Sequence, residues 1–212
     1  MKGSTAAAVN TADQSVVLQG VQWETYERLL ADQGDSARPR LYYDCGTLEI
    51  MSPSSRHEIL KETISLLFQL LATEVEIDFV AAGSTTFRRE DLHTGFEPDA
   101  CFYVRYVSAI RAKEDIDLSV DPPPDLVVEI QVTNAVLDKL SLFATVGVPE
   151  VWLHVDESVE ILRLLSNSYA KTSESSTLPG VTDGILTQFV KSRREMTNSA
   201  WINSVRDWAR NR

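Results

Sequence analysis

The sequence lacks the cysteine and glycine patterns that mark several common classes of protein. Its two cysteines, Cys45 and Cys101, stand alone in apolar surroundings, which favours buried free thiols over a disulfide or a zinc site. Free thiols are typical of the reducing cytoplasm. The sequence also has no glycine-rich phosphate loop, no GxSxG nucleophile elbow, no paired CxxC motif and no internal repeat. These absences exclude several common chemistries.

Long apolar segments are lacking as well. The most apolar stretch, residues 64–75, is interrupted by polar side chains and is too short to cross a bilayer. The first 15 residues carry one lysine and no sustained apolar run, so they do not resemble a signal peptide or a membrane anchor. We therefore expect a cytoplasmic protein with no membrane partner, with a disordered tail over residues 1–15 and a single domain over residues 16–212.

The sequence also lacks an excess of positive charge, because its net charge is −11. A general basic surface, which neutralises phosphates in many nucleic-acid-binding proteins, is therefore disfavoured. Basic residues still gather locally, at Arg88 and Arg89, within residues 191–194 and within residues 206–212. Such runs are typical of a solvated surface. Arg88 is kept as a candidate for contact with a substrate.

Apolar residues recur at three- and four-residue intervals in three segments. This spacing predicts amphipathic helices over residues 23–30, 56–76 and 198–210. A fourth helix is expected to begin at Asn134, whose side chain can cap it, and to end at Gly147.

Extended segments alternate with these helices. They are a hairpin over residues 40–51, strands over residues 79–87, 98–106, 125–132 and 149–155, and a second hairpin over residues 158–172. Residues 125–132, DLVVEIQV, have the nearly continuous β-branched character of a strand that is covered on both faces. We therefore predict an α/β fold with a central mixed sheet flanked by helices, decorated by an N-terminal helix plus hairpin and a C-terminal hairpin plus helix.

Two acids interrupt these apolar strands, Asp99 in EPDACFYV and Glu129 in DLVVEIQV. Burying a carboxylate is costly, so such acids are usually paired, hydrogen-bonded or bound to a metal. Lone acids can also lie at a strand edge and point to water. If the two strands are neighbours, both carboxylates can meet the backbone carbonyl of Ile130, and this set of hard oxygens suits Mg²⁺ or Mn²⁺.

The order of these elements and acids resembles the PD-(D/E)XK arrangement, and the chain is most similar to one branch of it, the Uma-two family of restriction endonucleases. Four segments carry the resemblance: LYYDCGTLEIMSPSSRHE at 41–58, FEPDACFYV at 96–104, PPDLVVEIQVTN at 123–134 and LDKLSLFATVGVPEVWLH at 137–154. The resemblance implies a restriction-endonuclease-like core.

The resemblance also implies roles for particular residues. Asp99 and Glu129 match the two metal-binding acids of the superfamily, and Glu58 matches an acid on the first core helix that often joins the metal shell. His57 stands where a contact with substrate or metal would be plausible. For Glu58 the alternative is an exposed acid placed favourably near a helix N-terminus. For His57 it is a surface or capping residue.

One position departs from the motif, because Gln131 stands where a strict ExK motif has lysine. An amide can hydrogen-bond to a water but supplies no positive charge to a phosphate. Lys139, in the first turns of the next helix, could reach back over the strand end on its long, flexible side chain. The alternative for Lys139 is a solvent-facing residue that pairs with Asp138 or Glu150.

These features and the resemblance predict a nuclease that depends on Mg²⁺ or Mn²⁺, hydrolyses phosphodiester bonds in DNA and forms a homodimer. Asp99, Glu129, Gln131 and Lys139 are its expected catalytic residues. Two alternatives stay open. One is a catalytically silent relative that binds nucleic acid or protein, and the other is a metal-dependent hydrolase of a small phosphate ester.

Overall fold

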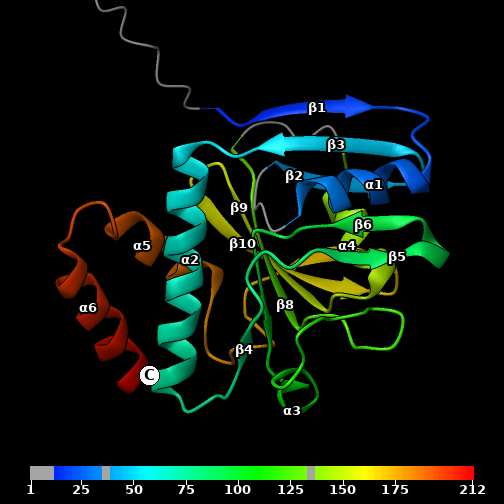
Figure 1. The fold of residues 1–212 in the computed structure, drawn as a ribbon. Coiled ribbons are helices and arrows are strands. Elements are labelled where there is room, and N and C mark those ends of the chain that lie inside the picture. Colours follow the sequence, from blue (N-terminus) through cyan, green and yellow to red (C-terminus); the bar gives the residue numbers. More distant parts are fainter. Residues whose placement is uncertain (1–11, 35–38, 133–136) are drawn as a thin grey trace, which may run out of the picture.

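The chain is built around two β-sheets, seen in the computed structural model of Figure 1, which describes residues 12–34, 39–132 and 137–212. One sheet has five antiparallel strands in the order β1-β3-β2-β6-β5. Its strands are β1 (Gln14–Leu18), β3 (Thr47–Ser52), β2 (Arg40–Asp44), β6 (Thr94–Phe96) and β5 (Phe87–Arg89). In the hairpin of β2 and β3, Cys45 and Gly46 both have positive φ, as a two-residue turn of this kind requires.

The second sheet has six strands in the order β11-β10-β9-β8-β7-β4 and is mixed. Its strands are β11 (Ser168–Thr172), β10 (Ser158–Leu165), β9 (Glu150–Val155), β8 (Leu126–Ile130), β7 (Ala100–Tyr103) and β4 (Val80–Ala81). Strand β8 runs parallel to β9 and antiparallel to β7, and all its residues are buried. The prediction of a mixed sheet with this strand at its centre is confirmed.

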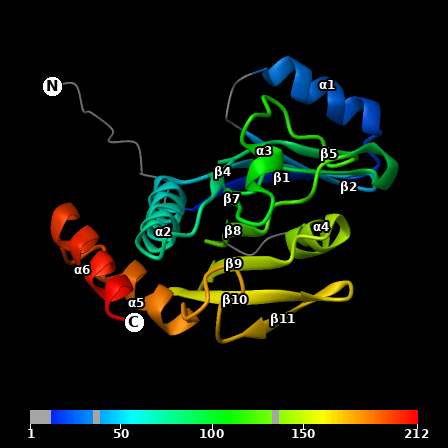
Figure 2. The same cartoon turned by 90° about the horizontal axis from the view of Figure 1, so that it is seen from below.

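Six α-helices and one 3₁₀ turn are described. They are α1 (Trp23–Gln33), α2 (Ser55–Glu74), η1 (Glu90–Leu92), α3 (Val107–Ile110), α4 (Lys139–Val146), α5 (Asp183–Ser192) and α6 (Asn198–Arg210). Figure 2 shows α2, α5 and α6 gathered on one side of the six-stranded sheet, and α1 on the outer face of the five-stranded sheet. None of the helices within the described ranges is long and apolar enough to cross a membrane.

Hydrophobic packing on both faces of β8 determines the direction in which the charged side chain of Glu129 points. On β8, Leu126, Val128 and Ile130 belong to the core under α2, α5 and α6. Val127 belongs to a different core, formed between the two sheets and α4. Because side chains alternate along a strand, Glu129 faces the same way as Val127, into the space between the sheets.

The N-terminus of α2 is held against this space. The apolar face of α2 packs on the six-stranded sheet, where the Phe68 ring stacks on the Phe102 ring at a centroid distance of 3.9 Å. The side chain of Ser54 accepts a hydrogen bond from the His57 backbone N–H, so the helix starts with a capped first turn. His57 and Glu58 are therefore placed next to the strand ends.

Several details differ from the sequence predictions. The strand expected over residues 79–87 is two short strands, β4 and β5, in different sheets. The prediction of a disordered tail over residues 1–15 is wrong for Gln14 and Ser15, which lie in β1 and pair with β3. Helix α4 begins at Lys139 with Asp138 as its cap, while Asn134 lies outside the described residues. Cys45 is exposed rather than buried, and Cys101 is buried as expected.

We expect Gly95→Ala to lower the free energy of unfolding by about 1–3 kcal/mol, because overpacking a rigid site is destabilising. A Cβ atom at Gly95 would collide with the ring of Tyr26, which is fully buried and stacks on Tyr43. Urea unfolding of the parent and the variant measures the difference.

The matched control is Gly184→Ala in α5, where a Cβ would meet nothing closer than 3.9 Å. Its free energy of unfolding should be unchanged or raised by up to about 1 kcal/mol. Equal effects of the two substitutions would show that the contact between Gly95 and Tyr26 is not tight.

Candidate functional site

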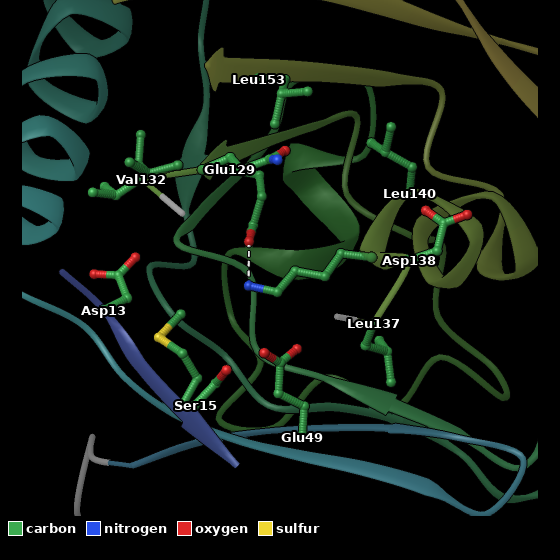
Figure 3. A pocket seen from close by; sticks show the side chains of 13 residues that line it. Asp13, Ser15, Glu49, Glu129, Val132, Leu137, Asp138, Leu140 and Leu153 are labelled. Atoms are coloured by element: carbon green, nitrogen blue, oxygen red, sulfur yellow. Dashed lines mark hydrogen bonds and ion pairs between the residues drawn. The ribbon is translucent and has the colours of Figure 1, made fainter. Parts of the chain in front are cut away.

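A cavity of about 330 Å³ lies between the two sheets. Strands β1 and β3 of the five-stranded sheet form one wall, and β8, β9 and the start of α4 form the other (Figure 3). The polar residues that line it are Asp13, Ser15, Glu49, Glu129, Gln131, Asp138 and Lys139. Acids therefore outnumber bases on the wall of this cavity.

Glu129 and Lys139 form a buried ion pair at the cavity wall. The Lys139 Nζ donates to Glu129 Oε1 at 2.6 Å and lies 3.9 Å from the centroid of the Tyr42 ring. Burial acts to lower the pKa of Lys139, but attraction to the Glu129 carboxylate outweighs it and raises the pKa above its usual value. The lysine therefore stays charged, and the alternative of a solvent-facing side chain that pairs with Asp138 or Glu150 does not hold.

The second carboxylate oxygen of Glu129 differs from the first in its hydrogen bonding. Glu129 is 3% exposed, and its Oε2 has no hydrogen-bond partner among the described residues. A buried carboxylate oxygen without a donor is costly. Glu129 thus presents one paired and one unpaired oxygen beside the cavity.

Asp99, like His57, is completely buried. Strands β7 and β8 pair with Ala100 opposite Val128, so Asp99 and Glu129 come at neighbouring strand ends, as the sequence suggested. Asp99 Oδ2 accepts the Ile130 backbone N–H at 2.7 Å. Its Oδ1 lies 2.7 Å from His57 Nε2 and forms an ion pair with Arg40. Both oxygens of Asp99 are therefore engaged within the protein.

His57 and Glu58 join the same network from the start of α2. The other ring nitrogen of His57 lies 2.9 Å from Asp13 Oδ2, and Glu58 accepts from Arg40 at 2.9 Å and from Lys61 at 3.2 Å. Glu58 is thus paired with cations, and His57 is enclosed between two carboxylates rather than exposed at the surface.

Sequence reasoning missed Arg40 and Asp13. Burial acts to raise the pKa of Asp13, but hydrogen bonds from His57 and from the Ser54 backbone hold it below the usual value. Arg40 is only 3% exposed. A buried acid such as Asp99 signals that some cation partner exists, but nothing in the sequence shows which of the chain's basic residues supplies it.

The remaining predicted residues lie apart from this network. Gln131 lines the cavity, and its backbone N–H donates to the His154 carbonyl at 2.8 Å. Arg88 is exposed on β5, an edge strand of the five-stranded sheet, and it does not line the cavity. The structure therefore brings Glu129, Gln131 and Lys139 together and leaves Arg88 outside.

Among the predicted metal ligands, Glu129 has a carboxylate oxygen that is open to a divalent ion. Within the described part of the chain, no three or more His, Cys, Asp or Glu side chains form a group that could hold a metal. Of the predicted carboxylates, Asp99 and Glu58 are engaged with Arg40, whereas Glu129 keeps an unpartnered oxygen beside the cavity. Mg²⁺ is commonly bound by one or two carboxylates with waters and substrate phosphates, so such an incomplete set suits it.

Comparisons with known proteins point to one family. Residues 23–187 match the sequence model of Uma2, described as "Putative restriction endonuclease". Among solved structures, the chain is similar to a crystal structure of "a putative nuclease belonging to DUF820" from Anabaena variabilis. The TM-score is 0.55 with 14% identity over 80% of this chain and 99% of the other, so that likeness shows the fold alone. No curated protein matches the chain.

We expect Arg40→Met to lower the free energy of unfolding at neutral pH by about 3–5 kcal/mol, because it removes the cation that Asp99 is buried against. Asp99→Asn in the same chain should recover part of this loss. Urea unfolding of both single variants and the double variant gives the coupling energy, expected at about 0.5–3 kcal/mol.

Lys61→Met is the control for this cycle, because Lys61 also pairs with Glu58 but has no bond to Asp99. Its effect should stay below about 1 kcal/mol. Strict additivity of the Arg40 and Asp99 substitutions would contradict the ion pair.

Proposed function

The chain belongs to the Uma2 family, and from that membership we propose that it is a nuclease that hydrolyses phosphodiester bonds in DNA with the help of Mg²⁺ or Mn²⁺. The restriction-endonuclease-like fold and the family description support a nuclease. Nucleases of this kind generally use divalent metals. The dependence on metal, the DNA substrate and cleavage within the strand are the proposed parts.

One observation carries the proposal, the ion pair of Glu129 and Lys139 at the cavity wall. The motif lysine is absent at position 131, where Gln131 stands. Lys139 supplies a buried positive charge to the same cavity from the first residue of α4. The two groups that this chemistry needs, an acid with an unpaired oxygen and a fixed cation, are therefore neighbours.

In the proposed mechanism, Glu129 and the Ile130 carbonyl would hold the ion, which would neutralise charge on the phosphate and lower the pKa of a bound water. Lys139, held by Glu129 and the Tyr42 ring, would donate to the phosphate oxygens as negative charge develops on them. Gln131 would orient a water through its amide.

Asp99 has a positioning role in this proposal. It holds the Ile130 backbone N–H and joins it to Arg40 and His57, so it fixes the strand end that carries Glu129. In this arrangement it offers no unengaged oxygen to an ion. Asp99 and Glu58 as metal ligands, and His57 and Arg88 as substrate contacts, stay predictions.

A second candidate is the catalytically silent relative. It is favoured by the ion pair of Asp99 and Arg40, because the Arg40 guanidinium already neutralises the carboxylate that matches a metal-binding acid of the motif. A silent relative would bind nucleic acid or protein without cleaving a phosphodiester bond. The absence of cleavage by a folded parent protein in Mg²⁺ and in Mn²⁺ would favour this candidate.

A homodimer and a cytoplasmic location also remain proposals. Strand β1 is an edge of the five-stranded sheet, and it carries two exposed apolar side chains, Val16 and Leu18, at 58% and 44%. An edge of this kind favours pairing with a second copy. Sedimentation of the parent protein would distinguish a monomer from a dimer.

We expect Glu129→Gln to reduce cleavage of a double-stranded DNA by at least about 100-fold in Mg²⁺, because the carboxylate beside the reacting phosphate is lost. Removal of divalent ions with EDTA should abolish cleavage by the parent. The control is Glu62→Gln, an exposed acid on α2, which should cleave like the parent. Full activity of Glu129→Gln would overturn the assignment.

We expect Lys139→Met to separate metal binding from turnover. Lys139 occupies one oxygen of Glu129, so its removal should keep or strengthen Mn²⁺ binding, measured by calorimetry. Cleavage should nevertheless fall by at least about 100-fold, because the developing charge loses its fixed cation. Lys139→Arg, which keeps the charge, is expected to recover part of the turnover, and equal loss in both variants would argue against a role for charge.

A further inference from the structure

Glu49 is a buried acid that none of the interactions described so far explains. It lies on β3 opposite Tyr42 of β2, is 3% exposed and lines the cavity. Its Oε2 has no hydrogen-bond partner within the described part of the chain. Most buried carboxylates are paired or coordinate a metal, so this oxygen is open to a partner beyond the described residues.

Glu49 lines the same cavity as Glu129. Figure 3 shows both side chains extending into the cavity, Glu49 from β3 and Glu129 from β8, with the end of the lysine that bonds Glu129 between them. Each has an Oε2 that lacks a donor among the described residues. The two sheets thus each contribute one unpaired carboxylate oxygen to a single space.

Charge in the cavity is unbalanced around this pair. Lys139 is the one cation among the described lining residues, and it is bonded to Glu129 Oε1. The other acids of the wall have their own partners, since Asp13 is bonded to His57 and Asp138 accepts from Ser141. One lysine therefore faces two buried carboxylates, and a divalent cation would supply the missing positive charge.

We propose that Glu49 is the second carboxylate ligand of a divalent ion held together with Glu129, an inference that rests on the proposed function. Two carboxylates that leave several positions to water and phosphate match the way in which Mg²⁺ and Mn²⁺ are bound in phosphodiester chemistry. Since the two ligands come from different sheets, the ion would also join the sheets. Binding should then raise the stability of the folded protein.

Calorimetric titration of Mn²⁺ into the full chain tests this inference without any substrate. We expect saturable binding to the parent, and at least tenfold weaker binding to Glu49→Gln and to Glu129→Gln. The control Glu62→Gln should bind like the parent. Mn²⁺ should raise the unfolding temperature of the parent and of the control, but not that of the two cavity variants.

Different outcomes separate this inference from the proposed function. Binding that is lost in Glu129→Gln but kept in Glu49→Gln would overturn the role of Glu49 and leave the nuclease proposal standing. Absence of binding to the parent would overturn the role of Glu49 and the proposed metal dependence together. Binding that needs both acids, without DNA cleavage by the parent, would support Glu49 and contradict the nuclease.

A variant that keeps the charge covers the case in which Glu49→Gln does not fold, which circular dichroism would reveal. Glu49→Asp retains the carboxylate on a shorter side chain, so it should fold and bind Mn²⁺ several-fold more weakly than the parent. Unchanged affinity of Glu49→Asp would overturn direct coordination by Glu49.

Discussion

Asp99 is buried completely, and the groups that it binds come from three elements that are distant in sequence. Arg40 begins β2 of one sheet, His57 lies in the first turn of α2, and the Ile130 N–H ends β8 of the other sheet. Removing one partner of a buried ion pair is strongly destabilising, since it leaves a charge without compensation. The need to satisfy this one carboxylate therefore fixes the relative position of both sheets and the helix around the cavity.

The lysine of this site shows how a positive charge can be supplied to a strand end from another position in the sequence. Position 131 follows β8, and position 139 begins α4, yet both line the same cavity. A lysine side chain is long and flexible enough to approach the strand end from the helix. Here it reaches Glu129, so the charge missing from Gln131 is present beside the acid of the motif.

Long, strongly patterned segments were predictable from the sequence, and short or paired ones were not. Helix α2 and strand β8 have enough residues to display their periods, and the Cys45-Gly46 turn has the required glycine. Strands β4 and β5 have two and three residues, too few to show alternation, so they could not be separated into different sheets. For the site, Asp99, Glu129 and Lys139 stood out as acids and a base near strand ends. Arg40, Asp13 and Glu49 did not, because their importance arises only when the two sheets pack together.

Strand β1 lies before the part of the chain that matches the family model. The family match begins at residue 23, whereas Ser15 of β1, together with Asp13 just before it, forms part of the cavity wall. The cavity wall formed by β8, β9 and α4 therefore lies within the family match, and the part formed by Asp13 and Ser15 lies before it. A substitution at Ser15 would therefore alter the cavity wall without changing any residue within the family match.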